Sequence, residues 1–386
     1  MSSVRGSSLK RAARPPSLAV LGTRGVPARY GGFEECAERV GLGLARRGWQ
    51  VTVFCPHSNE YRSPTYRDLR LRYAYHGPGV VGSVLYDVLC LLHAAVGRID
   101  VVLMLGYSSS FFCFIPRLLG KRVVINTDGL EWRRSKWPWV VRAYLRLAER
   151  SSGWAADTLV SDSRTVQSYQ FRAYRLRSRY IPYGADEPDG SSDDPGPEAL
   201  RRRWGLDPES YYIVVARLEP ENSIREAVEG FLAADTDRLL VIVGLATKYF
   251  ERSVRPLFGT NRRVRYLGAI YERRELDQLR RHAAAYLHGH TVGGTNPALL
   301  EAMALGTFVI ARDVPFNREV LADSGMYFRS SGDLARQIEF FETLDAKSLD
   351  PKIEAGRLRI RETYSWDRVI SRYEELFLAL LGRERV

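Results

Sequence analysis

Residues 18–35, LAVLGTRGVPARYGGFEE, decide the class of fold. Leu18–Gly22 is a short apolar run that ends in glycine, which is typical of a buried parallel strand. A loop rich in glycine and proline follows at Thr23–Gly32, and Phe33–Arg47 then has helical periodicity. Gln50–Cys55 is a second apolar strand. The order strand, glycine loop, helix, strand predicts the opening of a Rossmann-like α/β domain.

The same alternation continues along the chain and occurs twice. We expect further strands of the first sheet at Val101–Leu105, Val123–Thr127, Leu159–Ser161 and Tyr180–Pro182. The second alternation predicts strands at Tyr212–Ala216, Leu239–Val243, Val264–Leu267, Ala284–Leu287 and Phe308–Ala311, with a helix at Pro297–Leu305. Two such repeats predict an interdomain cleft at the carboxyl ends of parallel strands, where ligands bind preferentially.

These patterns divide the chain into five segments. We expect a basic, disordered tail at 1–16, a first Rossmann-like domain at 17–184 and a linker rich in Gly, Asp, Ser and Pro at 185–198. A second Rossmann-like domain follows at 199–365. The amphipathic segment 366–386 predicts a C-terminal helix that crosses back to the first domain.

Composition narrows the classes of function. The net charge is +12, and six of the 57 basic residues are lysines, which leaves 51 arginines. No dense basic tract stands out, so we do not expect a nucleic-acid partner. The four cysteines have no spacing suited to a metal and indicate a reducing, cytoplasmic compartment. The two most apolar stretches are Val80–Val96 and Val101–Pro116, and Asp87 and His93 interrupt the first. Neither gives the run of about 20 apolar residues that a membrane span needs, so we expect a soluble or peripheral protein.

The first glycine loop is the strongest local signal for a binding site. Gly22, Gly25, Gly31 and Gly32 would let backbone N–H groups approach a phosphate at a helix N-terminus. The loop matches neither GxGxxG nor GxxxxGK[ST], so it does not predict a dinucleotide or Walker-type site. An ordinary tight turn would explain only one or two of these glycines.

Arg217 and Asn222 follow the first strand of the second domain. An arginine at the carboxyl end of a strand, facing a cleft, can neutralise a diphosphate and help it leave. Asn222 adds a neutral donor nearby. The alternative for Arg217 is a solvated loop arginine in an arginine-rich protein.

The turn Gly293–Asn296 leads into a helix with Pro297 near its first turn. The free N–H groups of such a helix start form an anion site, for which Gly294, Thr295 and Asn296 are candidates. Glu301, about one turn into the helix, is positioned to accept ribose hydroxyls, or alternatively to cap the helix start. His288 and His290 lack an evident third ligand, so we expect no metal.

Asp128 and Glu131 follow a strand of the first domain and should lie across the cleft from the nucleotide. Either could orient or deprotonate an acceptor hydroxyl, and Asp128-Gly is also a common turn. With Arg29 and Tyr30 they are our candidates for the acceptor side. The segment 132–146 mixes tryptophans with cations, which indicates either a patch for anionic lipid headgroups or a partly buried helix with a basic face.

Together these segments resemble the family 4 retaining glycosyltransferases, which have the GT-B fold of two Rossmann-like domains facing a cleft. GTRGVPARYGGFE, DGLEW and GHTVGGTNP resemble most closely the branch that builds bacterial rhamnose-containing polysaccharides. The resemblance extends from Ser17 to about Trp366. It implies that Gly32, with Gly31, lies against the donor, that Arg217 binds the diphosphate, and that Glu301 is the second glutamate of a Glu-x7-Glu signature that holds the ribose.

Two positions depart from that family pattern. The first signature glutamate falls at Gly293, and the lysine that accompanies the arginine is replaced by Asn222. A missing carboxylate suggests a donor with a different hydroxyl pattern, such as a 6-deoxy sugar, and the Thr-Asn-Pro turn could compensate.

The sequence therefore predicts a cytoplasmic enzyme that transfers a hexose, L-rhamnose from dTDP-rhamnose, to a lipid-linked or polysaccharide acceptor. Asp128 and Arg217 are the candidate catalytic residues, and no cofactor or metal is expected. Peripheral contact with the inner face of the plasma membrane would follow from a lipid-linked acceptor. The alternatives are a nucleotide-sugar 2-epimerase and a noncatalytic protein that binds nucleotide-sugars or nucleic acid.

Overall fold

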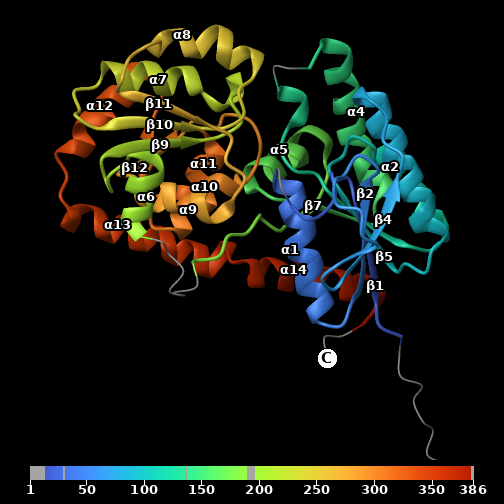
Figure 1. Ribbon diagram of the computed structural model, residues 1–386. Helices are drawn as coiled ribbons and strands as arrows, with labels where there is room; N and C mark the ends of the chain where they lie inside the picture. Colours follow the sequence, from blue (N-terminus) through green and yellow to red (C-terminus); the bar gives the residue numbers. More distant parts are fainter. Residues whose placement is uncertain (1–13, 29–30, 135–136, 189–195, 384–386) are drawn as a thin grey trace, which may run out of the picture.

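Two α/β domains lie side by side and are joined by a long C-terminal helix (Figure 1). The computed structural model describes residues 14–28, 31–134, 137–188 and 196–383. Most of the expected basic tail and residues 189–195 of the expected linker lie outside these ranges.

The first sheet has eight strands in the order β3-β4-β2-β1-β5-β6-β7-β8. All neighbours are parallel except β3 and β4. The strands are β1 (Ser17–Leu21), β2 (Gln50–Pro56), β3 (Thr65–Tyr66), β4 (Leu69–Ala74), β5 (Val101–Leu105), β6 (Arg122–Asn126), β7 (Thr158–Ser161) and β8 (Ser178–Tyr180).

The second sheet has six parallel strands in the order β11-β10-β9-β12-β13-β14. They are β9 (Tyr211–Val215), β10 (Leu239–Val243), β11 (Val264–Gly268), β12 (Ala285–His288), β13 (Val309–Arg312) and β14 (Met326–Phe328). In both sheets the strand order reverses beside the first strand, β1 or β9. Loops that follow strands at such a reversal point open into a crevice where ligands bind.

Helices cover both faces of each sheet, so the central strands are apolar on both sides, as all five buried residues of β1 show. In the first domain α2 (Gly79–Val96), α3 (Phe114–Leu118) and α4 (Trp139–Ala155) lie on one side, and α1 (Gly32–Arg46) lies on the other. The remaining first-domain elements are η1 (Ser110–Phe112), η2 (Glu131–Arg133) and α5 (Arg164–Tyr174).

In the second domain α7 (Ile224–Ala233) and α12 (Ser331–Glu342) share one core, and α9 (Arg273–Arg281), α10 (Pro297–Ala304) and α11 (Pro315–Leu321) pack into the other. The other elements are α6 (Gly196–Trp204), η3 (Pro220–Asn222), η4 (Phe250–Val254), α8 (Arg255–Phe258), α13 (Ala346–Arg359), η5 (Ile360–Tyr364) and α14 (Trp366–Leu381).

The predicted fold class, two α/β domains with largely parallel sheets, is confirmed. The expected strand at Tyr180–Pro182 lies two residues earlier, at β8. The edge strands β3 and β14 and the adjacent strand β4 were not predicted. β4 alternates apolar and polar residues, since Leu69 and Leu71 are buried while Arg70 and Arg72 are exposed, so it lacks the continuous apolar run of the central strands.

Helix α14 begins beside the second domain and packs along α1 of the first (Figure 1). Phe377 is fully buried, with its ring 5.9 Å from that of Trp49. Glu374 pairs with Arg47 at 2.9 Å and accepts a hydrogen bond from Trp49 Nε1 at 3.3 Å. Apolar packing and a mostly buried ion pair therefore tie the end of the chain to the first domain.

We predict that Phe377→Ala lowers the free energy of unfolding by about 3–5 kcal/mol, because it opens a cavity between α14 and α1. The measurement is urea unfolding followed by tryptophan fluorescence. Phe340→Ala on α12 is the control, because Phe340 is 55% exposed and its loss should cost less than about 0.5 kcal/mol. Equal effects of the two substitutions would contradict the bridging role of α14.

Candidate active site

A cleft of about 1410 Å³ lies between the two domains. The loop after β1 and the loop after β9 both line it, so the two strand-order reversals face the same space. The ten described candidate residues from the sequence all line this cleft: Gly31, Gly32, Asp128, Glu131, Arg217, Asn222, Gly294, Thr295, Asn296 and Glu301. Arg29 and Tyr30 lie outside the described residues.

Arg217 provides a cation to the cleft directly after β9. Within the described ranges its guanidinium has no hydrogen-bond or ion-pair partner, and it lies close enough to the Asp128 carboxyl for their charges to interact. Asn222 holds this loop in place, because its Nδ2 donates to the Arg217 carbonyl at 2.6 Å and its Oδ1 lies 2.5 Å from His290 Nδ1. Asn222 thus positions Arg217 against the loop that precedes α10.

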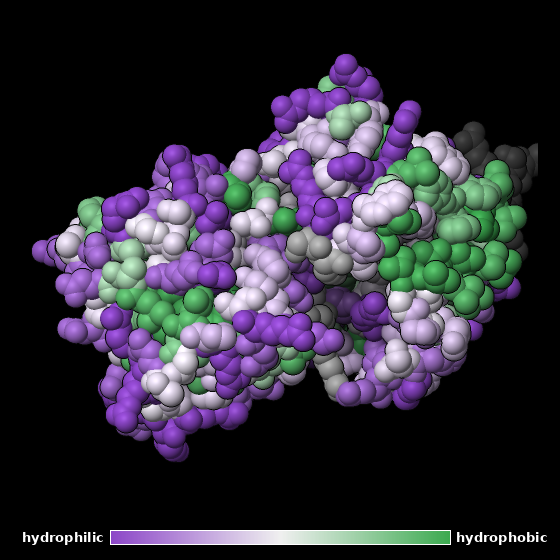
Figure 2. Space-filling view, turned by 90° about the horizontal axis from the view of Figure 1, so that it is seen from above, coloured by the Kyte–Doolittle hydropathy of each residue, from purple (hydrophilic) through white to green (hydrophobic). Residues whose placement is uncertain are grey.

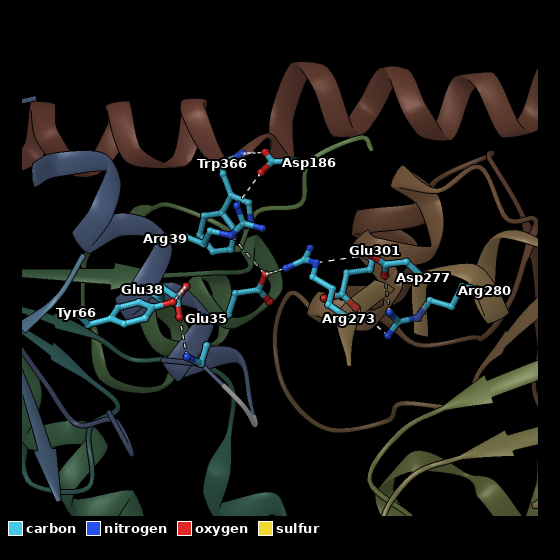
Figure 3. Close-up of polar contacts among 11 residues, drawn as sticks. Glu35, Glu38, Arg39, Tyr66, Asp186, Arg273, Asp277, Arg280, Glu301 and Trp366 are labelled. Carbon is cyan, nitrogen blue, oxygen red and sulfur yellow. Dashed lines mark hydrogen bonds and ion pairs between the residues drawn. The ribbon is translucent and has the colours of Figure 1, made fainter. Parts of the chain in front are cut away.

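Glu301, one turn into α10, is paired with Arg280 at 2.8 Å. Arg280 is 3% exposed, so the carboxylate of Glu301 is held in one orientation at the cleft wall. Figure 3 shows that this pair belongs to a longer chain of charges that crosses from one domain to the other. In order, its members are Asp186, Arg39, Glu35, Arg273, Asp277, Arg280 and Glu301.

The start of α1 also faces the second domain. A Cβ on Gly32 would lie 3.2 Å from the Pro297 side chain, so the N-termini of α1 and α10 meet across the cleft. Glu34 already accepts a hydrogen bond from the Arg24 N–H at 2.8 Å and from the Thr23 hydroxyl at 3.3 Å. Part of the glycine loop is therefore closed by a carboxylate of its own helix.

Asp162 is a site residue that the sequence analysis did not identify. It follows β7 and accepts a hydrogen bond from the Thr295 N–H at 2.8 Å, while its carbonyl accepts one from the Thr295 hydroxyl at 2.5 Å. The N–H groups expected to be free for an anion before α10 are therefore used within the protein, because Asp162 takes that of Thr295 and the Asn296 side chain accepts that of Ala298 at 2.9 Å. Burial, with the nearby Asp128 carboxyl, raises the pKa of Asp162 well above its usual range. Its position after a parallel strand was the available signal.

Asp128 and Glu131 differ in how they are held. Burial raises the pKa of Asp128, whose Oδ1 lies 3.5 Å from the Tyr183 hydroxyl. Glu131 instead pairs with Arg134 at 2.6 Å and accepts a hydrogen bond from Trp137 Nε1 at 3.0 Å. Asp128 is therefore the freer of the two carboxyl groups to meet a hydroxyl in the cleft.

The two histidines before α10 are neutral at pH 7. Burial lowers the pKa of His288 to about 3 and that of His290 well below its usual value. They add no positive charge to the field of Arg217. In the described part of the chain no group of three His, Cys, Asp or Glu side chains is arranged to hold a metal ion.

Asp87, on the inner face of α2, titrates near neutrality at the cleft wall. Burial raises its pKa to about 7, although the Ser109 hydroxyl donates to Oδ2 at 2.5 Å. A carboxyl whose pKa is raised on folding favours the folded state at low pH. This contribution is lost as pH rises from the ordinary value of 3.8 through about 7.

We predict that Asp87→Asn changes the pH dependence of stability. Between pH 5 and pH 8 the wild type should lose free energy of unfolding relative to the variant. The loss should be about 1.4 kcal/mol for each pH unit up to the folded-state pKa of Asp87. Urea midpoints at the two pH values measure this difference, and Asp100→Asn serves as a half-buried control. A constant difference between wild type and Asp87→Asn would show that Asp87 does not titrate in this range.

Comparisons with known proteins fit this geometry. Residues 17–186 match a domain of unknown function (DUF1972), and residues 198–358 match the glycosyl transferases group 1. No curated protein matches the chain. Sucrose-phosphate synthase from Thermosynechococcus elongatus is similar in structure, with a TM-score of 0.80 at 16% identity, covering 96% of this chain and 100% of its own.

Two further solved structures have the same two-domain arrangement. HepE from Anabaena in complex with UDP and glucose has a TM-score of 0.74 at 15% identity, covering 95% of this chain and 100% of its own. A glycosyltransferase from Rickettsia africae has a TM-score of 0.73 at 14% identity, covering 97% of this chain and 100% of its own. Residues 198–358 are thus similar to the glycosyl transferases group 1, and the whole chain has the two-domain GT-B fold.

Proposed function

We propose that the protein is a retaining glycosyltransferase. It transfers a hexose, L-rhamnose from dTDP-rhamnose, to a lipid-linked or polysaccharide acceptor in the synthesis of a bacterial cell-surface glycan. The observation that carries the proposal is the placement of Arg217. Its unpaired guanidinium lines the same cleft as the N-terminus of α10 and the fixed carboxylate of Glu301.

Each of these three groups matches one part of a nucleoside-diphosphate sugar. Arg217 and the helix N-terminus supply positive potential for the diphosphate, and Glu301 accepts hydrogen bonds from the ribose. The match of residues 198–358 to the glycosyl transferases group 1 supports this assignment. So do the structures of HepE, which were obtained with UDP, with UDP and glucose, and with UDP-glucose.

Transfer would depend on stabilising the leaving group. As the bond between the sugar and the phosphate breaks, negative charge builds on the diphosphate beside Arg217, and a fixed cation stabilises that charge more than it stabilises the ground state. In front-face displacement the leaving phosphate takes the proton of the acceptor hydroxyl, so no protein nucleophile is needed. Asp128 would orient that hydroxyl from the first domain.

The proposed setting is the cytoplasmic face of the plasma membrane, where a lipid-linked acceptor is presented. No metal enters the proposed mechanism, because Arg217 and the start of α10 provide the positive charge. The nucleotide-sugar 2-epimerase alternative predicts turnover of the donor without an acceptor, which the transfer assay described below detects.

We predict that Arg217→Ala weakens binding of the preferred nucleoside diphosphate at least about tenfold, because it removes a charge-assisted contact of about 1.5–3 kcal/mol. Glu301→Gln, which leaves an amide oxygen for Arg280, should weaken binding several-fold. Thermal shift with UDP, dTDP, GDP and ADP measures both. Arg225→Ala on α7 is the control, since Arg225 pairs with Glu229 on the surface. If no nucleotide stabilises the wild type, the proposal fails.

The nucleobase and the sugar need a separate experiment. UDP offers Glu301 two ribose hydroxyls and dTDP offers one, so Glu301→Gln should cost UDP more affinity than dTDP. We expect the wild type to transfer rhamnose from dTDP-rhamnose to a lipid-linked glycan with retention, which the anomeric NMR signals of the product report. Transfer from UDP-glucose alone would replace rhamnose in the proposal, and epimerisation without an acceptor would replace the transferase.

A further inference from the structure

Helix α2 presents a continuous apolar stripe to solvent. Val81, Leu85, Leu92 and Val96 are 81%, 46%, 43% and 81% exposed, and their spacing places them on one face of the helix. Asp87 is the one Asp, Glu, Lys or Arg in this helix, and it is buried on the opposite face. By length and composition α2 could cross a membrane.

The packing of α2 shows how such a helix would meet a membrane. Its inner residues Tyr86, Cys90, Leu91 and Ala94 are buried in the core under the first sheet. A helix fixed to a sheet along its length cannot span a bilayer without unfolding the domain. It can lie in the plane of the headgroups with its outer face inserted.

The apolar surface continues from α2 onto its neighbours. α3 packs against α2 and exposes Leu118 and the adjoining Leu119, at 77% and 57%. Phe114 on α3 stacks near Trp154 on α4, with ring centroids 5.9 Å apart, and both rings are partly exposed. We call these exposed residues of α2, α3 and α4 the α2–α4 face. Figure 2 shows a broad hydrophobic area on the side of the first domain.

The charges on the α2–α4 face are positive. The acidic residues of the three helices, Asp87 and Glu149, are 6% and 0% exposed. Arg117, Arg146 and Arg150 are exposed on α3 and α4, and Arg117 pairs with Asp157 at 3.2 Å. Exposed apolar and aromatic side chains with arginines beside them complement a surface of anionic lipid.

Two tryptophans of segment 132–146, which the sequence analysis considered for this role, do not contribute to the α2–α4 face. Trp132 Nε1 donates to Glu149 at 3.1 Å and Trp137 Nε1 donates to Glu131 at 3.0 Å, so both rings are held within the domain. Trp139, which is 78% exposed, is the exception. For Trp132 and Trp137 the second interpretation given above, a partly buried segment, therefore fits better than a lipid-binding patch.

We propose that the α2–α4 face docks on anionic lipid headgroups with α2 lying in the membrane plane. This inference rests on the proposed function, because it delivers the lipid-linked acceptor to the site. The first turns of α2 line the cleft at Gly79, Val80 and Ser83, while the outer face of the same helix lies on the bilayer. An acceptor headgroup therefore has a short path from the membrane along the start of α2 into the cleft.

The test is co-sedimentation of the full chain with phosphatidylcholine vesicles that contain or lack phosphatidylglycerol. We expect binding to the anionic vesicles, weakened by salt, and at least about a tenfold loss of affinity in Leu85→Glu/Leu92→Glu. Phe340→Glu on α12, an exposed apolar site of the second domain, should bind as the wild type does. Because both leucines are partly exposed and outside the cleft, nucleotide thermal shift should be unchanged in the double variant.

Three outcomes would overturn the docking proposal. They are no binding of the wild type to anionic vesicles, equal binding of the double variant, or a dimer in sedimentation velocity that the double variant converts to a monomer. The last would assign the face to a second copy of the chain. Nucleotide binding without vesicle binding would leave the transferase proposal standing, and vesicle binding without nucleotide binding would refute the transferase proposal alone.

Discussion

The backbone contact between Gly129 of the first domain and Gly293 of the second sets the geometry of the cleft. A Cβ on Gly129 would lie 2.2 Å from Gly293 Cα, so only glycine allows the two loops to approach this closely. Asp162 closes the same contact from the first domain through its hydrogen bond with the Thr295 N–H. Because Arg217, Glu301 and Asp128 all belong to elements next to these loops, their separation depends on this contact.

The conformation of Gly293 gives a physical reason for the missing glutamate of the Glu-x7-Glu signature. Gly293 has φ +137°, a conformation that side chains rarely adopt, and a Cβ there would lie 2.9 Å from His290 Nε2. A glutamate there would have a strained backbone and would press on the His290 ring of the second domain. Asp128 is the residue before Gly129, so the first domain brings a carboxyl group close to the position where the second domain lacks one.

The sequence predicted the features of this site that are local and missed those that depend on long-range contacts. Arg217 follows a strand, and Glu301 lies in the first turns of a helix. Periodicity and helix-start chemistry therefore place both residues at the cleft. The ion pair between Glu35 and Arg273 joins residues 238 positions apart in the sequence. The hydrogen bond between Asp162 and Thr295 joins residues 133 positions apart. No spacing rule predicts such pairs. Similarly, the sequence of α2 showed that the helix is apolar, but it did not show which of its faces packs against the sheet.

Charge pairing in the cleft leaves Arg217 without an ion-pair partner among the described residues. Glu301 is matched by Arg280, and Glu35 is matched by Arg273, so these carboxylates and arginines largely neutralise one another. Burial raises the pKa of Asp128 and of Asp162. Arg217 therefore places positive potential at the end of β9, where the strand order reverses. An anionic group of a ligand completes the charge balance there without breaking an existing pair, which favours binding over rearrangement.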